Sequence, residues 1–102
     1  ESAAHWPLVH APGTVFRYAN NDTLMAVEAI SSGFKAHPPS ELFAKLGMDR
    51  TVAETDWRGD YILSSQVWTT ARDLAKLGQL YLDKGVLPDG TRILPESWLA
   101  YV

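Results

Sequence analysis

Apolar residues recur along the chain at three- and four-residue spacing, which predicts a mainly α fold. The clearest helix is predicted over residues 70–84. Thr70 is a favourable N-cap, Asp73 occupies the acidic position of a capping box, and Gly85 ends the pattern. One apolar face is formed by residues that recur at three- and four-residue spacing: Ala71, Leu74, Ala75, Gly78, Tyr81 and Leu82. We expect an amphipathic helix that packs through this face.

Three shorter helices are predicted on either side. Residues 21–32 carry apolar side chains at helical spacing, with Asn20 or Asn21 as the N-cap and Gly33 as the end. A second helix begins at residues 38–39, where proline is tolerated in the first turn.

Gly47 suits the left-handed cap that ends this second helix, with Met48 packing back onto the last turn. The third short helix follows Pro95 and runs to the end of the chain. Residues 61–63 and residues 93–94 are expected to form short strands. Helix therefore dominates and sheet is minor.

Composition limits the size and the partners of the domain. The chain has 102 residues, 46% of them hydrophobic and 21% charged, which is ordinary for a globular chain and predicts at most one domain. The net charge is −3 and no basic stripe is present, so nucleic acid is not an expected partner. No apolar run is long enough to span a membrane, and the chain does not begin with Met, so we expect a processed or excised piece.

The motif with the most chemistry is Tyr-x-Asn at Tyr18 and Asn20, which follows a Pro-Gly turn at residues 12–13. Phe16, Tyr18 and Asn20 alternate, so an extended backbone places them on one face. A phenol can transfer a proton, and a carboxamide can donate and accept hydrogen bonds. Taken alone, the motif clearly favours a structural interpretation, a half-buried aromatic residue followed by a helix cap.

Four segments together resemble one family. They read Pro-Gly-x-x-Phe-x-Tyr-x-Asn at 12–20, Leu-Gly-Met at 46–48 with Thr51, Thr-Ala-Arg-Asp-Leu-Ala-Lys-Leu-Gly-Gln-Leu-Tyr-Leu at 70–82, and Arg-Ile-Leu-Pro-Glu-Ser-Trp at 92–98. Their order and spacing are similar to serine hydrolases of the class C beta-lactamase and DD-peptidase type, which include penicillin-binding proteins, esterases and aminohexanoate-dimer hydrolases.

The resemblance implies that residues 1–102 form a single partial domain, the helical region of a beta-lactamase-like serine hydrolase, lacking most of the α/β domain. It gives Tyr18 the role of proton relay and Asn20 that of a substrate contact. The family cleaves an amide or ester bond of a small molecule through an acyl-enzyme, without a cofactor, and its members are often periplasmic or secreted. A serine hydroxyl becomes a good nucleophile only when a base removes its proton, and a lysine ammonium favours the ionised form of a neighbouring phenol.

Two of the family's three motifs are missing. No Ser-x-x-Lys precedes Tyr18, and no Lys-Thr-Gly or His-x-Gly follows. We therefore expect an inactive fragment of an enzyme. Ser32 and Lys35 do have the Ser-x-x-Lys spacing, but they follow Tyr-x-Asn and are expected to straddle the end of a helix, so we interpret them as a terminal serine and a surface lysine.

Other interpretations stay open. The chain could be a non-catalytic helical module for protein interaction or ligand binding, with Tyr18 and Asn20 structural. Trp57 and Trp68 either line a substrate cleft or are buried.

The three histidines have no ligand spacing with acidic residues, so no metal site is expected. A face that packs on a missing domain would leave an exposed apolar patch, which predicts self-association of the isolated chain.

Overall fold

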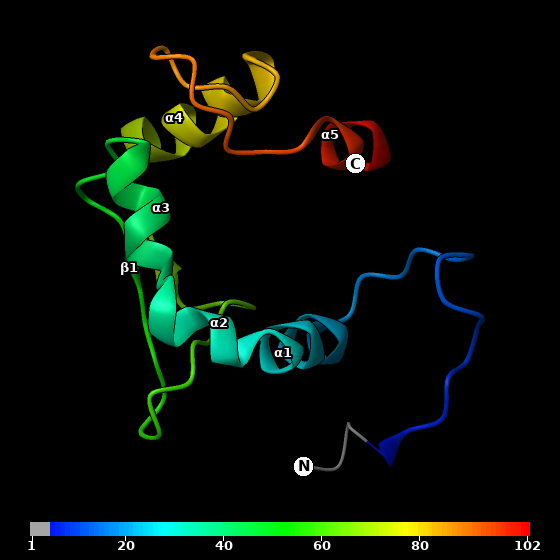
Figure 1. Ribbon diagram of the computed structural model, residues 1–102. Helices are drawn as coiled ribbons and strands as arrows, with labels where there is room; N and C mark the ends of the chain where they lie inside the picture. Colours follow the sequence, from blue (N-terminus) through cyan, green and yellow to red (C-terminus); the bar gives the residue numbers. More distant parts are fainter. Residues whose placement is uncertain (1–4) are drawn as a thin grey trace. The chain divides into compact units, whose positions relative to one another are not determined.

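The computed structural model describes residues 5–102 and is mainly helical, as the sequence predicts (Figure 1). Two short strands, β1 and β2, form an antiparallel two-stranded sheet. The elements in chain order are α1 (Asn20–Ala29), α2 (Ser31–Ala36), α3 (Pro39–Lys45), β1 (Val52–Ala53), β2 (Val67–Trp68), α4 (Ala71–Leu82) and α5 (Glu96–Tyr101). The chain divides into two compact units, which are described separately.

Unit 1 comprises residues 5–37 and 53–67 and contains α1 and α2. The predicted boundaries of its helix are wrong at both ends. The N-cap of α1 is Ala19, without a side-chain hydrogen bond, so neither predicted asparagine caps the helix. The helix breaks at Ile30, where φ is −107° and ψ is 8°, and resumes as α2, which contains Gly33.

The second stretch of unit 1, residues 53–67, folds back on itself as a loop. Thr55 and Tyr61 form an isolated antiparallel bridge, so the strand predicted over residues 61–63 reduces to one bridging residue. The Tyr61 ring packs edge-on against Phe34 of α2, with ring centroids 5.3 Å apart. This T-shaped contact joins the loop to the helices of the same unit.

Unit 2 comprises residues 38–52 and 68–102 and contains α3, α4 and α5. Pro39 is the first residue of α3, as predicted, because its fixed φ and missing N–H suit a first turn. Gly47 has a φ of +66°, and the Met48 N–H donates to the Phe43 carbonyl at 2.8 Å. This confirms the predicted cap and packs Met48 back onto α3, where only 4% of it is exposed.

The C-terminal end of α4 is also capped as expected. Gly85 has a φ of +76° and donates its N–H to the Leu80 carbonyl at 2.8 Å. A turn follows, and the antiparallel bridge forms between Val86 and Arg92, one residue before the predicted strand at 93–94. The Arg92 guanidinium donates to the carbonyl of Lys84 at 3.0 Å and thereby satisfies an exposed carbonyl near the end of α4.

Very little apolar surface is buried. In residues 5–102, the buried hydrophobic side chains are Met48 and Leu80. The accessible surface is 8253 Å², whereas two separate globules of half this mass would together expose about 6,900 Å². The described residues therefore bury much less apolar surface than is usual for a globular domain of this composition.

The orientation of α4 corrects the sequence interpretation. The apolar face predicted to pack is exposed: 56% of Leu74 and 77% of Leu82 lie in solvent. The covered side carries Asp73 and Leu80, which are 3% exposed, and the half-buried Leu77 between them. These three residues recur at i, i+4 and i+7, and loop residues of unit 2 satisfy the buried acid.

Candidate functional site

The sequence-predicted site residues lie where the chain enters α1. Tyr18 is in the extended segment before the helix, and 89% of it is exposed. Asn20 is the first residue of α1 and is also exposed. The phenol is therefore not buried in apolar packing, and both polar groups are accessible to a ligand or to another polypeptide.

A hollow of about 530 Å³ lies between the segment from Trp6 to Arg17 and the start of α1. Its walls combine apolar and polar groups, including Phe16, Arg17 and Asn20, but not Tyr18. The structure thus places Asn20 at this hollow and the Tyr18 phenol outside it. Phe16, which shares the alternation of the motif, is 91% exposed.

The Ser-x-x-Lys spacing at Ser32 and Lys35 lies within α2, so the prediction that it straddles a helix end is wrong. The helix restarts after the break at Ile30 and includes both residues. Both side chains are exposed, and no hydrogen bond joins them within the described residues. The remaining argument against a catalytic role for Ser32 and Lys35 is that they follow Tyr18 in the sequence. Lys35 lies on the surface, as the sequence analysis predicts.

The tip of the unit 1 loop presents an exposed tryptophan. Trp57 is 86% exposed, and the Arg58 guanidinium lies 4.8 Å from its ring centroid. One Asp56 carboxylate oxygen accepts the N–H groups of Arg58 at 2.8 Å and Asp60 at 3.1 Å. Neither Trp57 nor Trp68, which is 61% exposed, is buried, so of the two roles expected for them the structure excludes burial.

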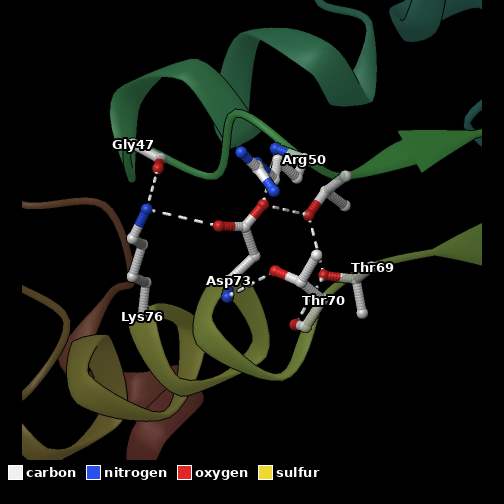
Figure 2. A network of polar contacts seen from close by, with 7 residues as sticks. Gly47, Arg50, Thr69, Thr70, Asp73 and Lys76 are labelled. Carbon is white, nitrogen blue, oxygen red and sulfur yellow. Dashed lines mark hydrogen bonds and ion pairs between the residues drawn. The ribbon is translucent and has the colours of Figure 1, made fainter.

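The most completely satisfied polar cluster is centred on Asp73 in unit 2 (Figure 2). One carboxylate oxygen accepts the N–H of Arg50 at 2.7 Å and the hydroxyl of Thr51 at 2.8 Å. The other oxygen accepts from the Lys76 ammonium at 3.2 Å, and Lys76 also donates to the Gly47 carbonyl. The cluster ties the loop after α3 to the first turns of α4.

This cluster also explains the N-terminus of α4. The Thr70 hydroxyl accepts the Asp73 N–H at 3.2 Å, which is the predicted N-cap (Figure 2). In a complete capping box the acid would accept the N–H of the cap residue. Here the Asp73 carboxylate instead binds residues more than 20 positions earlier in the chain.

The charge of Asp73 is stabilised in the fold. Burial on its own would raise the pKa of this carboxyl, but the hydrogen bonds from Thr51, Arg50 and Lys76 and the positive charge of Lys76 outweigh it, so the pKa lies below its ordinary value. An ionised carboxylate whose oxygens are occupied by donors is a poor acid or base. We therefore interpret the cluster as structural.

Within residues 5–102, no group of three histidine or acidic side chains is placed to hold a metal ion. In the same part of the chain, no helix combines the length and the apolar character needed to cross a membrane.

Comparison with known proteins gives a partial match to a hydrolase. A stretch of 62 residues is 42% identical to the 6-aminohexanoate-dimer hydrolase of Paenarthrobacter ureafaciens, a protein of the beta-lactamase-like family. The match covers 60% of this chain and 16% of that relative, so the chain spans only about a sixth of the protein that it matches. No family model and no solved structure matches. The chain thus has distant, partial homology to a serine hydrolase.

Sequence patterns did not reveal the partners of Asp73. Asp73 was expected to be the acid of a capping box, because it lies three residues after Thr70. The sequence gives no direct signal that Arg50 and Thr51 would approach its carboxylate. Thr51 was singled out only through the family resemblance. Contacts that join residues so far apart depend on tertiary packing, which local spacing does not encode.

Proposed function

We propose that this chain is the Tyr-x-Asn-bearing helical part of a longer serine hydrolase that cleaves an amide or ester bond through an acyl-enzyme. The observation that carries the proposal is the 62-residue match to a 6-aminohexanoate-dimer hydrolase, which is one of the kinds of enzyme that the four sequence segments resemble. The large exposed apolar surface is consistent with a chain that packs against further polypeptide.

In this proposal Tyr18 is the proton relay. A phenol that serves this role must be accessible to a serine hydroxyl and to the leaving group, and 89% of Tyr18 is exposed. The serine and its lysine come from outside this chain. Attack by the serine oxygen on the carbonyl carbon forms the acyl-enzyme and expels the amine or alcohol, which takes up the proton that the serine gave to the Tyr18–lysine pair. Water then attacks the acyl-enzyme, releases the acid and restores the serine.

Asn20 is the proposed substrate contact. Its carboxamide can donate to a substrate carbonyl and accept from a substrate N–H, and its position at the first residue of α1 leaves it in solvent. Asn20 lines the hollow described above together with apolar residues, which suits a small molecule with an amide and a hydrocarbon portion.

The test is the full reading frame that encodes this segment. We expect a Ser-x-x-Lys before Tyr18 and a Lys-Thr-Gly or His-x-Gly after residue 102. A serine-directed phosphonate should label the full-length protein at that serine and should not label the isolated chain. The proposal would be refuted by a reading frame that contains neither motif, or by labelling of Ser32 in the isolated chain.

A second candidate is a non-catalytic helical interaction module, which is favoured by the exposed apolar face of α4. It predicts that a full-length protein carrying Tyr18→Phe keeps its full activity, if it has any, because the phenol is then structural. The phosphonate and the Tyr18→Phe variant together separate the two candidates.

A further inference from the structure

The turn that follows α4 contains the single Asp-Gly dipeptide of the sequence, Asp89–Gly90. Both residues are exposed, and they lie between Val86 and Arg92, which form an antiparallel bridge. The Gly90 N–H donates to the Leu87 carbonyl at 2.9 Å and closes the turn. Glycine has no Cβ to hinder the approach of its own nitrogen to a neighbouring group. An aspartate carboxyl group before glycine is therefore unusually open to attack by the backbone.

The chemistry of such a pair is an internal cyclisation. The Gly90 nitrogen attacks the side-chain carboxyl carbon of Asp89, a C–N bond forms, the nitrogen loses its proton, and the hydroxyl of the protonated carboxyl group leaves as water. The product is a cyclic imide, a succinimide. Water then opens the ring at one of its two carbonyls and gives either aspartate again or isoaspartate, in which the main chain runs through the side-chain carbon. The water lost is returned, so no co-reactant is required.

We propose that Asp89 is a site of spontaneous modification to isoaspartate and that the folded turn holds this reaction back. The Thr91 N–H donates to the Asp89 carboxylate at 2.9 Å, and the nucleophilic nitrogen of Gly90 is itself engaged with the Leu87 carbonyl. Attack requires the nitrogen and the carboxyl carbon to meet in a reactive orientation. At least these two hydrogen bonds must break first, so the reaction passes through an opened form of the turn.

The charge of Asp89 acts in the same direction. The hydrogen bonds from the Thr91 N–H and from its hydroxyl lower the pKa of this carboxyl, so it is ionised at neutral pH. A carboxylate has no hydroxyl that can leave as water. The folded turn therefore reduces both the approach of the two groups and the fraction of the reactive, protonated acid.

The modification would alter the structure around the turn. Isoaspartate adds one carbon to the main chain between Val86 and Arg92, whose bridge depends on the present length of the segment. The Arg92 guanidinium donates to the carbonyls of Lys84 and Leu94, each at 3.0 Å. A longer turn disturbs these contacts and loosens the C-terminal end of α4. The reaction is independent of the proposed hydrolase function, since it needs only residues of this chain.

The experiment is incubation of the 102-residue chain at neutral pH and constant temperature, in buffer and in enough urea to unfold it. Trypsin cleaves after Lys84 and Arg92 and releases the turn as residues 85–92. Chromatography and fragmentation mass spectrometry then measure aspartate, the succinimide, which is lighter by one water, and isoaspartate. We expect isoaspartate at position 89 to form at least about tenfold faster in urea, because the rate of a reaction through an open state follows the population of that state.

Three variants test the chemistry and the restraint. In urea, Gly90→Ala should slow the reaction at least severalfold, because its Cβ hinders the nitrogen. In buffer, Arg92→Ala should accelerate it at least about threefold, since two hydrogen bonds that hold the segment are lost. Arg72→Ala, the same change on α4 outside the turn, should leave the rate unchanged, and circular dichroism checks the helix content of both arginine variants.

Three results would overturn the proposal. The first is the absence of isoaspartate at position 89 after incubation in urea, which would remove the site. The second is an equal rate in buffer and in urea, and the third is an Arg92→Ala chain that reacts no faster than the wild type. Either of these last two would remove the restraint by the folded turn.

Discussion

The Thr51 hydroxyl donates a hydrogen bond to the Asp73 carboxylate at 2.8 Å, across 22 positions of the sequence. The same hydroxyl lies 2.7 Å from that of Thr69 (Figure 2). These contacts hold the segment before β1 beside the start of α4. Since few apolar side chains are buried in the described chain, directional polar contacts of this kind carry an unusually large share of the tertiary structure of unit 2.

Asp73→Ala should destabilise the chain, because it leaves the N–H of Arg50 and the hydroxyl of Thr51 without their acceptor. We expect the melting temperature to fall by at least about 5 °C, as measured by circular dichroism. Asp83→Ala is the matched control, since it removes an exposed acid from the other end of α4, and it should change the melting temperature by less than about 2 °C. Equal effects of the two substitutions would contradict the structural role of Asp73.

Stability should fall at acidic pH through the same carboxylate. The pKa of Asp73 is lowered in the folded chain, so its contribution is present above the unfolded pKa of about 3.9 and is lost as the pH falls through the lower folded value. Urea denaturation between pH 2 and pH 6 should show this loss in the wild type.

In Asp73→Asn the loss should be smaller, because that position no longer titrates. The pKa of Asp89 is also lowered, mainly because the Thr91 N–H donates a hydrogen bond to its carboxylate at 2.9 Å. Asp89→Asn is therefore the comparison variant, since it removes a second acid whose pKa is lowered. If Asp73→Asn shows the same pH dependence as the wild type, the cluster does not stabilise the charged form.

Two glycines of unit 2 should respond to alanine in opposite directions. At Gly85, φ is +76° and a Cβ would lie 2.6 Å from the Leu94 carbonyl oxygen, so Gly85→Ala should cost more than about 2 kcal/mol in the free energy of unfolding. Gly78 lies within α4 with open space around it, so Gly78→Ala should stabilise by about 0.5–1 kcal/mol. Both values come from urea denaturation, and equal shifts would show that the cap at Gly85 is not formed in solution.

In the full-length protein, Tyr18→Phe should lower kcat by a factor of about 10²–10⁴, which is the usual contribution of general acid–base catalysis. KM should change little, because the ring remains. Tyr101→Phe is the control, since Tyr101 is a similarly exposed phenol on α5 and has no proposed role in the reaction. A change in kcat of less than about twofold for Tyr18→Phe would remove the proton-relay role.

Local signals predicted the elements of unit 2 well. Proline at the start of α3, the cap at Gly47 and the N-cap at Thr70 act within one turn of the backbone, and each is found as expected. The break at Ile30 was missed because Gly33 was the stronger helix-ending signal, yet it is accommodated inside α2. Local residue preferences identify which elements form more reliably than where they end.

The packing of α4 could not be predicted from its periodicity. The pattern correctly identifies an amphipathic helix, but it cannot say whether the apolar side is covered by this chain or by another. The covered side is instead selected by Asp73, whose donors come from a distant loop. The roles of Tyr18 and Asn20 stay predictions, since they require groups that this chain does not contain.

The Trp57 loop has a practical consequence. Its indole is immersed in water beside the Arg58 guanidinium, and the Asp56 hydrogen bonds hold the backbone of the turn that carries it. Such a ring fluoresces at long wavelength and is open to ionic quenchers, and it would shift to shorter wavelength when any polypeptide covers it. Because Trp6, Trp68 and Trp98 are also exposed, a variant that keeps Trp57 as its single tryptophan would report whether this tip of the chain is bare or occupied.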